Sequence, residues 1–337
     1  SNQNHITKRD IALAVESSSG DALLVYGARQ QIPLYATFSN GAWSTLAPIA
    51  ATLSTPNSVA IWTELAASPS SDEVVLVVAD VNRRLWTIRW DGGAWDAASA
   101  QVIATNVKRN PDTNTLSNRP FDVAFEQQSG DLLVVWGREN QNGIGYRRRE
   151  AGSWQSGQSL ASALAGGEVH FVDLAADPSS DRIAGGFFDL GDGTERLGLG
   201  TWSGSAWVGA QEVDSQIRDI NDRALGDFPG AVTWLGSTGR AICLVSDDSP
   251  RLSWWEWTSA QTAWQSRGGI ALPNNKPVES VQVRGGGVGE ALGVVTDNQS
   301  RIHAIYFDGT SWTALNPSPF SPTVSRVNSR PFDVAFP

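Results

Sequence analysis

Four segments of the chain carry an arginine at a fixed distance before an aromatic residue, and these groups are the first candidates for a chemical role. The arginines are Arg84, Arg196, Arg251 and Arg301, each six residues before Trp90, Trp202, Trp257 or Phe307. Each arginine follows a turn with an aspartate: Asp80, Asp189, Asp247 or Asp297. A guanidinium presents a planar fork of donors, so it can pair with that carboxylate or bind the oxygens of a ligand. The ion pair is favoured, because no glutamate recurs in register with a tryptophan to complete a ligand pocket.

One loop has enough closely spaced oxygens to suggest a calcium site. It contains Asp189, Asp192 and Glu195, and Ca²⁺ prefers six to eight oxygen ligands. The spacing differs from that of an EF-hand, so a solvated acidic turn is the preferred interpretation. No cofactor is expected, and calcium is the alternative. The three histidines lie in no recognisable motif, and no nucleophile elbow, zinc motif or phosphate loop is present. We therefore expect no catalytic residues, although scattered loops can assemble an acidic site without a sequence motif.

Composition excludes several classes of partner. The formal net charge of -10 argues against nucleic-acid binding, which needs an excess of Lys and Arg. The only basic run, Arg147 to Arg149, is expected to mark a solvated strand face. No apolar run approaches the roughly 18 residues of a membrane helix, so membrane insertion is not expected. The absence of Met, the few lysines and the many small polar residues suit an extracellular or cell-surface protein.

The sequence is built from repeats. The segment Asn118 to Phe125 returns almost unchanged as Ser329 to Phe336, and a weaker copy spans Arg9 to Glu16. A shorter period lies inside these units and is marked by a tryptophan after a Gly- or Ser-rich turn. These tryptophans are Trp43, Trp95, Trp154, Trp207, Trp264 and Trp312, at intervals of 48 to 59 residues. The chain therefore contains six copies of the shorter unit.

Each copy reads as four short antiparallel strands. In the second copy we expect strands over 58–67, 73–79 and 84–90 and a fourth from Trp95, joined by turns rich in Gly, Asp, Asn and Ser. This length per repeat is typical of propeller blades. The prediction is an all-β, six-bladed β-propeller forming a single domain over 1–337. Its blades span approximately 9–57, 58–118, 119–167, 168–222, 223–276 and 277–329, and 330–337 is a spare strand.

Paired aromatic rings flank the hairpin between the third and fourth strands. Trp90 and Trp95 enclose Asp91-Gly92-Gly93-Ala94, and the same arrangement recurs at Trp202 to Trp207 and at Phe307 to Trp312. Packing between blades is the favoured role of these rings. The hairpins resemble those of six-bladed lectin-type propellers, in particular the fucose-binding lectins, over the whole chain. That resemblance implies glycan binding, with Arg84, Arg196, Arg251, Arg301, Trp90, Trp202 and Trp257 as the ligand-binding residues.

Three functions remain open. The favoured one is a non-catalytic extracellular or cell-surface propeller that serves as a binding platform or as a structural subunit of a surface assembly. The alternatives are a carbohydrate-binding lectin and a propeller hydrolase or lyase with an acidic site built from loops. Partners are then a protein or a glycan at the cell surface. The spare strand, Arg330 to Phe336, is expected to close the chain's own ring or to be donated to a second copy.

Overall fold

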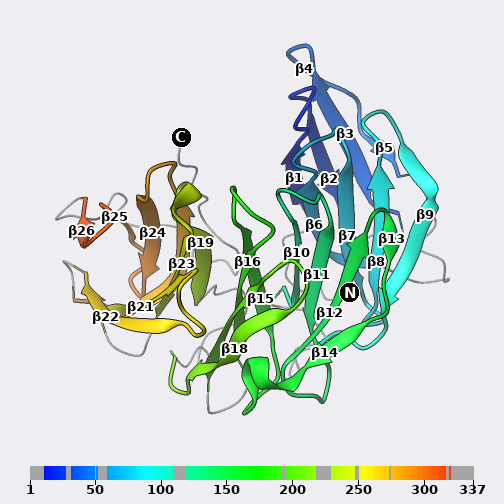
Figure 1. Cartoon of the computed structure of the whole chain (residues 1–337). Helices are drawn as coiled ribbons and strands as arrows, with labels where there is room; N and C mark the ends of the chain where they lie inside the picture. The colour runs from blue at the N-terminus through cyan, green and yellow to red at the C-terminus, as the bar shows by residue number, and fades with distance from the viewer. Residues whose placement is uncertain are drawn as a thin grey trace, which may run out of the picture.

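The computed structural model describes residues 11–27, 32–49, 51, 59–108, 119–190, 195–217, 229–246, 250–272, 275–315 and 319. These residues form six antiparallel sheets that follow one another along an arc in sequence order (Figure 1). The prediction of an all-β, six-bladed propeller is confirmed. Among the described residues, no helix is long and apolar enough to cross a membrane.

Every blade is a meander of four strand positions. Blade 1 contains β1 (Ile11–Val15), β2 (Ala22–Tyr26), β3 (Leu34–Ser39), β4 (Ala42–Trp43) and β5 (Ala47–Pro48). Blade 2 contains β6 (Ala60–Ala67), β7 (Val74–Asp80), β8 (Leu85–Trp90) and β9 (Trp95–Ala104). Blade 3 contains β10 (Phe121–Phe125), β11 (Leu132–Gly137), β12 (Ile144–Glu150), β13 (Ser153–Trp154) and β14 (Gln158–Leu160). In blades 1 and 3 the fourth strand is split into two pieces that both pair with the third strand.

The remaining blades follow the same order. Blade 4 contains β15 (Phe171–Ala176), β16 (Ile183–Asp189), β17 (Arg196–Trp202) and β18 (Trp207–Asp214). Blade 5 contains β19 (Gly230–Trp234), β20 (Arg240–Ser246), β21 (Arg251–Thr258) and β22 (Gln265–Ala271). Blade 6 contains β23 (Val278–Gly285), β24 (Ala291–Asp297), β25 (Ile302–Phe307) and β26 (Trp312–Ala314). The strands predicted for the second repeat agree with β6 to β9 to within two residues.

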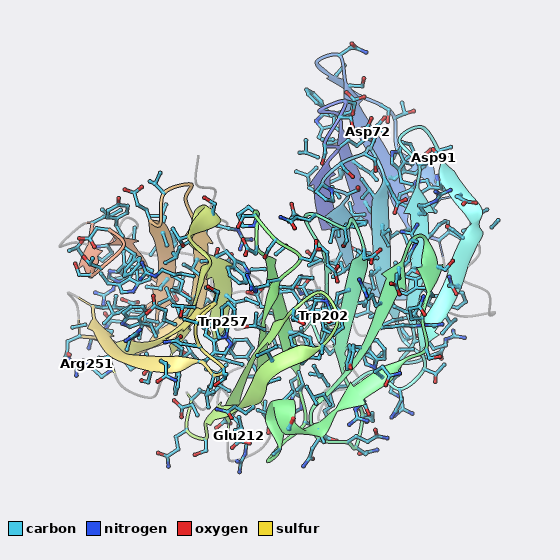
Figure 2. The ribbon with its side chains drawn as sticks, viewed as in Figure 1. Asp72, Asp91, Trp202, Glu212, Arg251 and Trp257 are labelled. Atoms are coloured by element: carbon cyan, nitrogen blue, oxygen red, sulfur yellow. The ribbon has the colours of Figure 1, made fainter. Side chains whose placement is uncertain are left out.

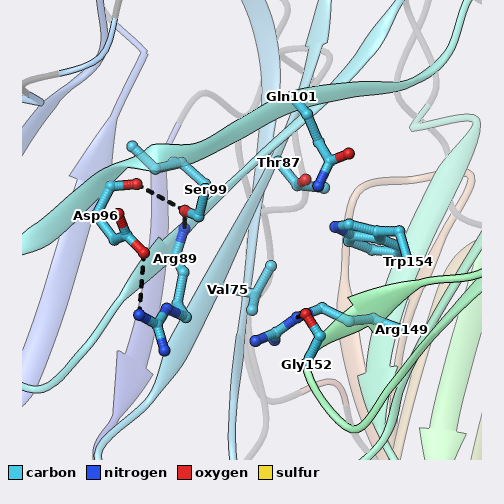
Figure 3. Close-up of a pocket in the computed structure, with 10 residues that line it drawn as sticks. Val75, Thr87, Arg89, Asp96, Ser99, Gln101, Arg149, Gly152 and Trp154 are labelled. Carbon is cyan, nitrogen blue, oxygen red and sulfur yellow. Dashed lines mark hydrogen bonds and ion pairs between the residues drawn. The ribbon is translucent and has the colours of Figure 1, made fainter.

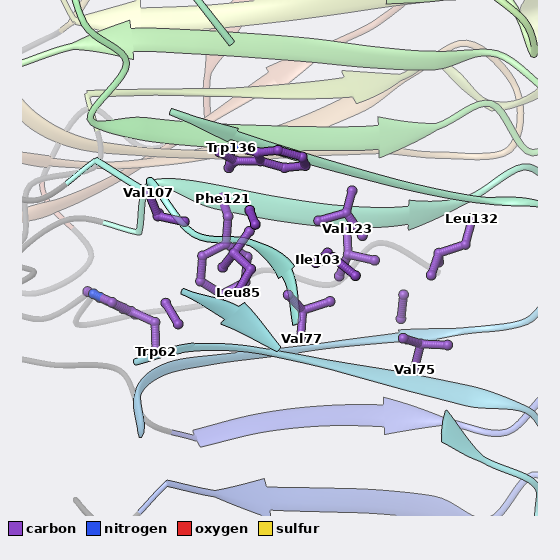
Figure 4. Packing of buried hydrophobic residues seen from close by; sticks show 14 of the residues in the cluster. Trp62, Val75, Val77, Leu85, Ile103, Val107, Phe121, Val123, Leu132 and Trp136 are labelled. Carbon is purple, nitrogen blue, oxygen red and sulfur yellow. The ribbon is translucent and has the colours of Figure 1, made fainter. Parts of the chain in front are cut away.

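First strands of successive blades contact one another, and the second strands of blades 2, 3 and 4 are buried on both faces. β7 and β11 are apolar along almost their whole length and every residue is buried, as expected for a sheet covered by a neighbour on each side. The core therefore lies between blades. Figure 4 shows the cluster between blades 2 and 3, where Val77 and Leu85 pack against Phe121 and Val123. Burial of one such side chain stabilises the fold by about 1.5–3 kcal/mol.

The longer sequence repeat corresponds to a pair of blades. The Trp90 indole of blade 2 donates to a carboxylate oxygen of Glu16 in blade 1 at 2.6 Å. One pair later, the Trp202 indole of blade 4 donates to Glu126 of blade 3 at 2.7 Å. The same bond thus fastens blade 2 to blade 1 and blade 4 to blade 3. Blades 2 and 3 belong to different pairs, and among the described residues this tryptophan–glutamate bond is not present between them.

The hairpin turns have the chemistry that their sequences predict. Gly92, Gly204 and Gly309 have φ values of 96, 92 and 94°, a region that L side chains rarely adopt. The Asp91 carboxylate accepts hydrogen bonds from the backbone N–H groups of Ala94 and Gly93, which lower the pKa of Asp91. These short-range bonds fix each hairpin without help from other blades.

Blade 1 ends the arc with an apolar face. Ile11, Leu13 and Val15 are 49, 57 and 55% exposed, whereas Phe121 and Phe125 at the corresponding positions of blade 3 are buried. The strand predicted to close the ring or to associate with a second copy, Arg330 to Phe336, lies outside the described residues. Its role stays a prediction.

Candidate functional site

The four arginines singled out from the sequence lie in different environments. Arg84 Nε donates to Asp80 at 2.8 Å, and Arg301 Nε donates to Asp297 at 2.7 Å, so the expected ion pair is present in blades 2 and 6. Arg196 pairs instead with Glu212, at 2.6 Å. Arg251 is exposed at the periphery of the molecule (Figure 2), and its turn residue Asp247 lies outside the described residues. The structure does not bring these arginines together with open tryptophan rings.

The three tryptophans of that group are buried between blades. Trp90, Trp202 and Trp257 are only 2 to 4% exposed. Trp90 and Trp202 each donate to a glutamate of the preceding blade, and the Trp257 ring lies 5.7 Å from the Arg182 guanidinium. These contacts are those of packing residues, which is the role that the repeated hairpins favoured.

A cavity of about 310 Å³ lies between blades 2 and 3 and brings together a different set of residues (Figure 3). We call it the Trp154 pocket. Its polar and aromatic lining includes Thr87, Arg89 and Gln101 of blade 2 and Arg149 and Trp154 of blade 3. The volume is at the lower end of the range for small-molecule sites, so the pocket has room for a ligand of modest size.

The pocket exists because an arginine replaces a packing tryptophan. In the sheet of blade 3, Arg149 pairs with Leu132 at the beginning of β11 and with Trp154 of β13 across the hairpin. Trp90 and Trp202 hold the same position in blades 2 and 4 and fill the contact with the preceding blade. Arg149 does not fill it in this way. The expectation that the run Arg147 to Arg149 marks a solvated face is wrong for Arg149, whose side chain is 12% exposed.

Charges around the pocket are balanced. Glu73 lies between the two arginines: Arg149 forms a short bond to one of its oxygens and lies 3.3 Å from the other, and Arg89 is 3.7 Å away. Arg89 also donates to Asp96 at 2.9 Å. Two cations thus face two carboxylates, which fixes the guanidinium planes and leaves no excess charge for an ionic ligand.

Gln101 of blade 2 keeps unused hydrogen-bonding groups at this pocket. No side-chain hydrogen bond of Gln101 to another described residue is present, whereas the unpaired Thr87 hydroxyl is fully buried. Figure 3 shows the two side chains next to each other, facing Trp154. A free amide group beside an aromatic ring suits a neutral ligand with many hydroxyls.

A second charged cluster ties three blades together at their first strands. Arg119 of blade 3 lies 2.7 Å from Glu64 of blade 2, 3.1 Å from its own Asp122 and 3.5 Å from Asp173 of blade 4. Asp122 also accepts from the backbone N–H of Leu174, at 2.8 Å. Arg119, Asp122 and Asp173 are all buried. Sequence reasoning missed this cluster, although the repeated Arg-Pro-Phe-Asp segment contains two of its members.

Asp122 has the raised pKa that an acidic catalytic site would also show. Burial raises the pKa of the Asp122 carboxyl to about 7, against the opposing effect of the Arg119 charge and with a further rise from Glu64 and Asp173. All of these groups are engaged with each other or with backbone donors. The cluster is therefore a structural connection between blades.

The raised pKa of Asp122 predicts a pH dependence of stability. Between the ordinary value of 3.8 and about 7, the folded chain holds a proton that the unfolded chain has released. Protonation therefore stabilises the fold at the acidic end, and this stabilisation is lost as the pH rises through 7. We expect the free energy of unfolding of the wild type, relative to Asp122→Asn, to fall by up to about 1.4 kcal/mol per pH unit in this window. Urea melts at pH 5, 6 and 7 measure it, and parallel curves for the two proteins would contradict it.

The calcium hypothesis stays a prediction. Asp192 lies outside the described residues. Asp189 lies 3.1 Å from His170, and Glu195 is buried. Within the described part of the chain, no group of three or more acidic, histidine or cysteine side chains is placed to hold a metal ion.

Comparison with known proteins gives matches of structure only. No protein-family model matches the sequence, and no curated protein matches it either. The chain is similar to the BP39L lectin from Burkholderia pseudomallei, at 14% identity and a TM-score of 0.59 over 92% of this chain and 84% of that one. It is also similar to AofleA from Arthrobotrys oligospora, at 15% identity and a TM-score of 0.51 over 94 and 87%. The similarity to six-bladed lectin-type propellers that the hairpins suggested is thus confirmed at the level of the fold.

Proposed function

We propose that this protein is a carbohydrate-binding propeller and that the Trp154 pocket holds a sugar residue. The observation that carries the proposal is the convergence of Gln101 and Trp154 in one cavity whose charges are already balanced. A sugar offers hydroxyl groups to the amide side chain and an apolar ring face to the indole. This places the lectin alternative above the general binding platform that the sequence favoured.

Two further points support a lectin over an enzyme. The similar structure with a TM-score of 0.59 is a lectin, and the raised pKa of Asp122 belongs to a buried inter-blade connection. An extracellular or cell-surface location, with a surface glycan as partner, is the expectation that goes with this function. Cell fractionation tests that expectation.

The proposal predicts binding that depends on the Trp154 pocket. A glycan array probed with the full chain is expected to give a signal for at least one sugar. Calorimetry with that sugar should show a roughly tenfold loss of affinity for Gln101→Ala, the value of one hydrogen bond to a ligand. Arg149→Lys should lose at least as much, because a lysine cannot keep the planar contact with Glu73.

Gln211→Ala is the matched control. Gln211 occupies the position of blade 4 that Gln101 occupies in blade 2, and it is exposed. Its replacement should leave the affinity unchanged. An array without any signal, or a signal that survives both pocket variants, contradicts the proposed function.

A further inference from the structure

A second cavity continues the interface between blades 2 and 3 beyond the Trp154 pocket. Its volume is about 440 Å³, and we call it the Trp136 pocket. Its polar and aromatic lining includes Asn106, Trp136, Arg138, Gln141, Gln158 and Ser159. It is larger than the first cavity, and its lining is again polar around one indole.

The polar groups of the Trp136 pocket are available to a ligand. The structure contains no side-chain hydrogen bond from Gln158 or Ser159 to another described residue, and both are exposed. Arg138 donates to Gln141 and, at 2.7 Å, to the carbonyl of Asn142, while its buried Nε has no partner. An exposed amide and hydroxyl and a held guanidinium therefore line this pocket together with Trp136, whose side chain is largely buried.

Asn106 is held in place before any ligand binds. Two hydrogen bonds join it to Glu139 across the blades: the Glu139 N–H donates to the Asn106 carbonyl, and the Asn106 side-chain amide donates to the Glu139 carbonyl, each at 3.1 Å. The Lys108 N–H donates to the Gly137 carbonyl at 2.8 Å. A preformed site loses less entropy on binding than one that must be ordered.

The two pockets follow one another along the same strands. On blade 2, β9 contributes Gln101 to the Trp154 pocket, and the segment directly after it contributes Asn106 to the Trp136 pocket. On blade 3, Trp154 of β13 lines the first pocket and Gln158 of β14 lines the second. From Gln101 to Asn106 an extended chain spans at most about 17 Å, at roughly 3.3 Å per residue. One ligand of several linked rings can therefore reach both pockets.

We infer that the two pockets are neighbouring subsites and that the preferred ligand is an oligosaccharide. This inference rests on the proposed function and extends it from a single sugar to a chain of linked sugars. The Trp154 pocket holds one sugar residue, and the Trp136 pocket holds a residue further along the same chain. The two cavities share one interface and the same kind of lining, hydroxyl and amide groups beside an indole. A single-sugar ligand would leave the larger cavity without a role.

The test compares short and long sugars on the full chain by calorimetry. The short probes are the methyl glycosides of fucose, mannose, galactose and N-acetylglucosamine, and the long probes are linear tetrasaccharides that end in each of these sugars. Wild-type protein should bind one tetrasaccharide about tenfold more tightly than the matching methyl glycoside. The double variant Gln158→Ala, Ser159→Ala should lose that gain and keep the affinity for the methyl glycoside. Gln101→Ala should weaken both ligands by the same factor.

The outcomes separate the inference from the proposed function. Equal affinity for the short and the long sugar, or a gain that persists in the Gln158→Ala, Ser159→Ala variant, overturns the two-subsite inference and leaves the single-sugar function intact. Absence of binding by every probe overturns both. Gln211→Ala, on the corresponding strand of blade 4, controls for general effects of an amide replacement.

Discussion

Replacing Arg119 with glutamine is expected to lower the free energy of unfolding by about 3–5 kcal/mol, because it removes one partner of a buried ionic cluster. Arg119 is the only cation within contact of Glu64, Asp122 and Asp173 among the described residues. Without it, these carboxylates remain close together with no compensating charge. Urea or guanidinium melts followed by tryptophan fluorescence measure the loss.

Two further variants keep this prediction specific. Arg83→Gln removes an exposed arginine that lies 3.5 Å from Glu139, and such surface pairs contribute about 0–1 kcal/mol. Combining Arg119→Gln with Asp122→Asn should restore part of the stability in melts well above pH 7, where the Asp122 carboxyl would otherwise carry an unpaired charge. A loss for Arg119→Gln no larger than that for Arg83→Gln means that the cluster does not hold the blades together.

Replacing Trp202 with alanine is expected to cost about 3–5 kcal/mol, the usual range for deleting a large buried aromatic side chain. The Trp202 ring packs against Trp207 at 5.8 Å and Tyr146 at 5.7 Å between centroids. Its indole N–H also donates to Glu126, so the variant leaves a buried carboxylate without that donor. Chemical denaturation is again the measurement.

Two substitutions calibrate the effect of Trp202→Ala. Trp202→Phe keeps most of the ring and loses only the hydrogen bond, so its loss should be intermediate. Trp43→Ala removes a tryptophan that is 50% exposed and should have a much smaller effect. Sugar affinity should be unchanged in folded Trp202→Ala, because Trp202 does not line the Trp154 pocket. Lost sugar binding at wild-type stability would instead assign Trp202 to the ligand site.

The fold was accessible from sequence because its determinants are local and repeated. Asp91 and Gly92 specify one hairpin, and the same turn chemistry recurs at Gly204 and Gly309. The alternation of apolar strands with polar turns then gives the strand positions, and the length of the repeat gives the blade. Long-range information was needed only to arrange the blades around an axis.

The candidate site was less accessible, because it depends on which residues of two blades meet. Arg149 was assigned to a solvated basic run, whereas it takes the position that Trp90 and Trp202 occupy in other blades. That signal was present: the hairpin of the third repeat is the one with an arginine where the packing tryptophan stands in the second and fourth. The pairing of Arg149 with Glu73 joins residues 76 positions apart and has no local signature.

The acidic cluster was hidden for a similar reason. Glu64, Asp122 and Asp173 occupy equivalent positions in three successive blades, yet blade 1 has Ala12 and blade 6 has Gln282 at the matching places. The repeat is thus imperfect where the charges are. Only the close approach of the first strands shows that Arg119 reaches all three carboxylates.

A crystal structure of the full chain with the sugar that gives the strongest array signal tests the Trp154 pocket most directly. We expect electron density for a sugar between blades 2 and 3, in contact with Trp154 and within hydrogen-bond distance of Gln101. Density for that sugar at another blade interface, with the Trp154 pocket empty, would contradict it.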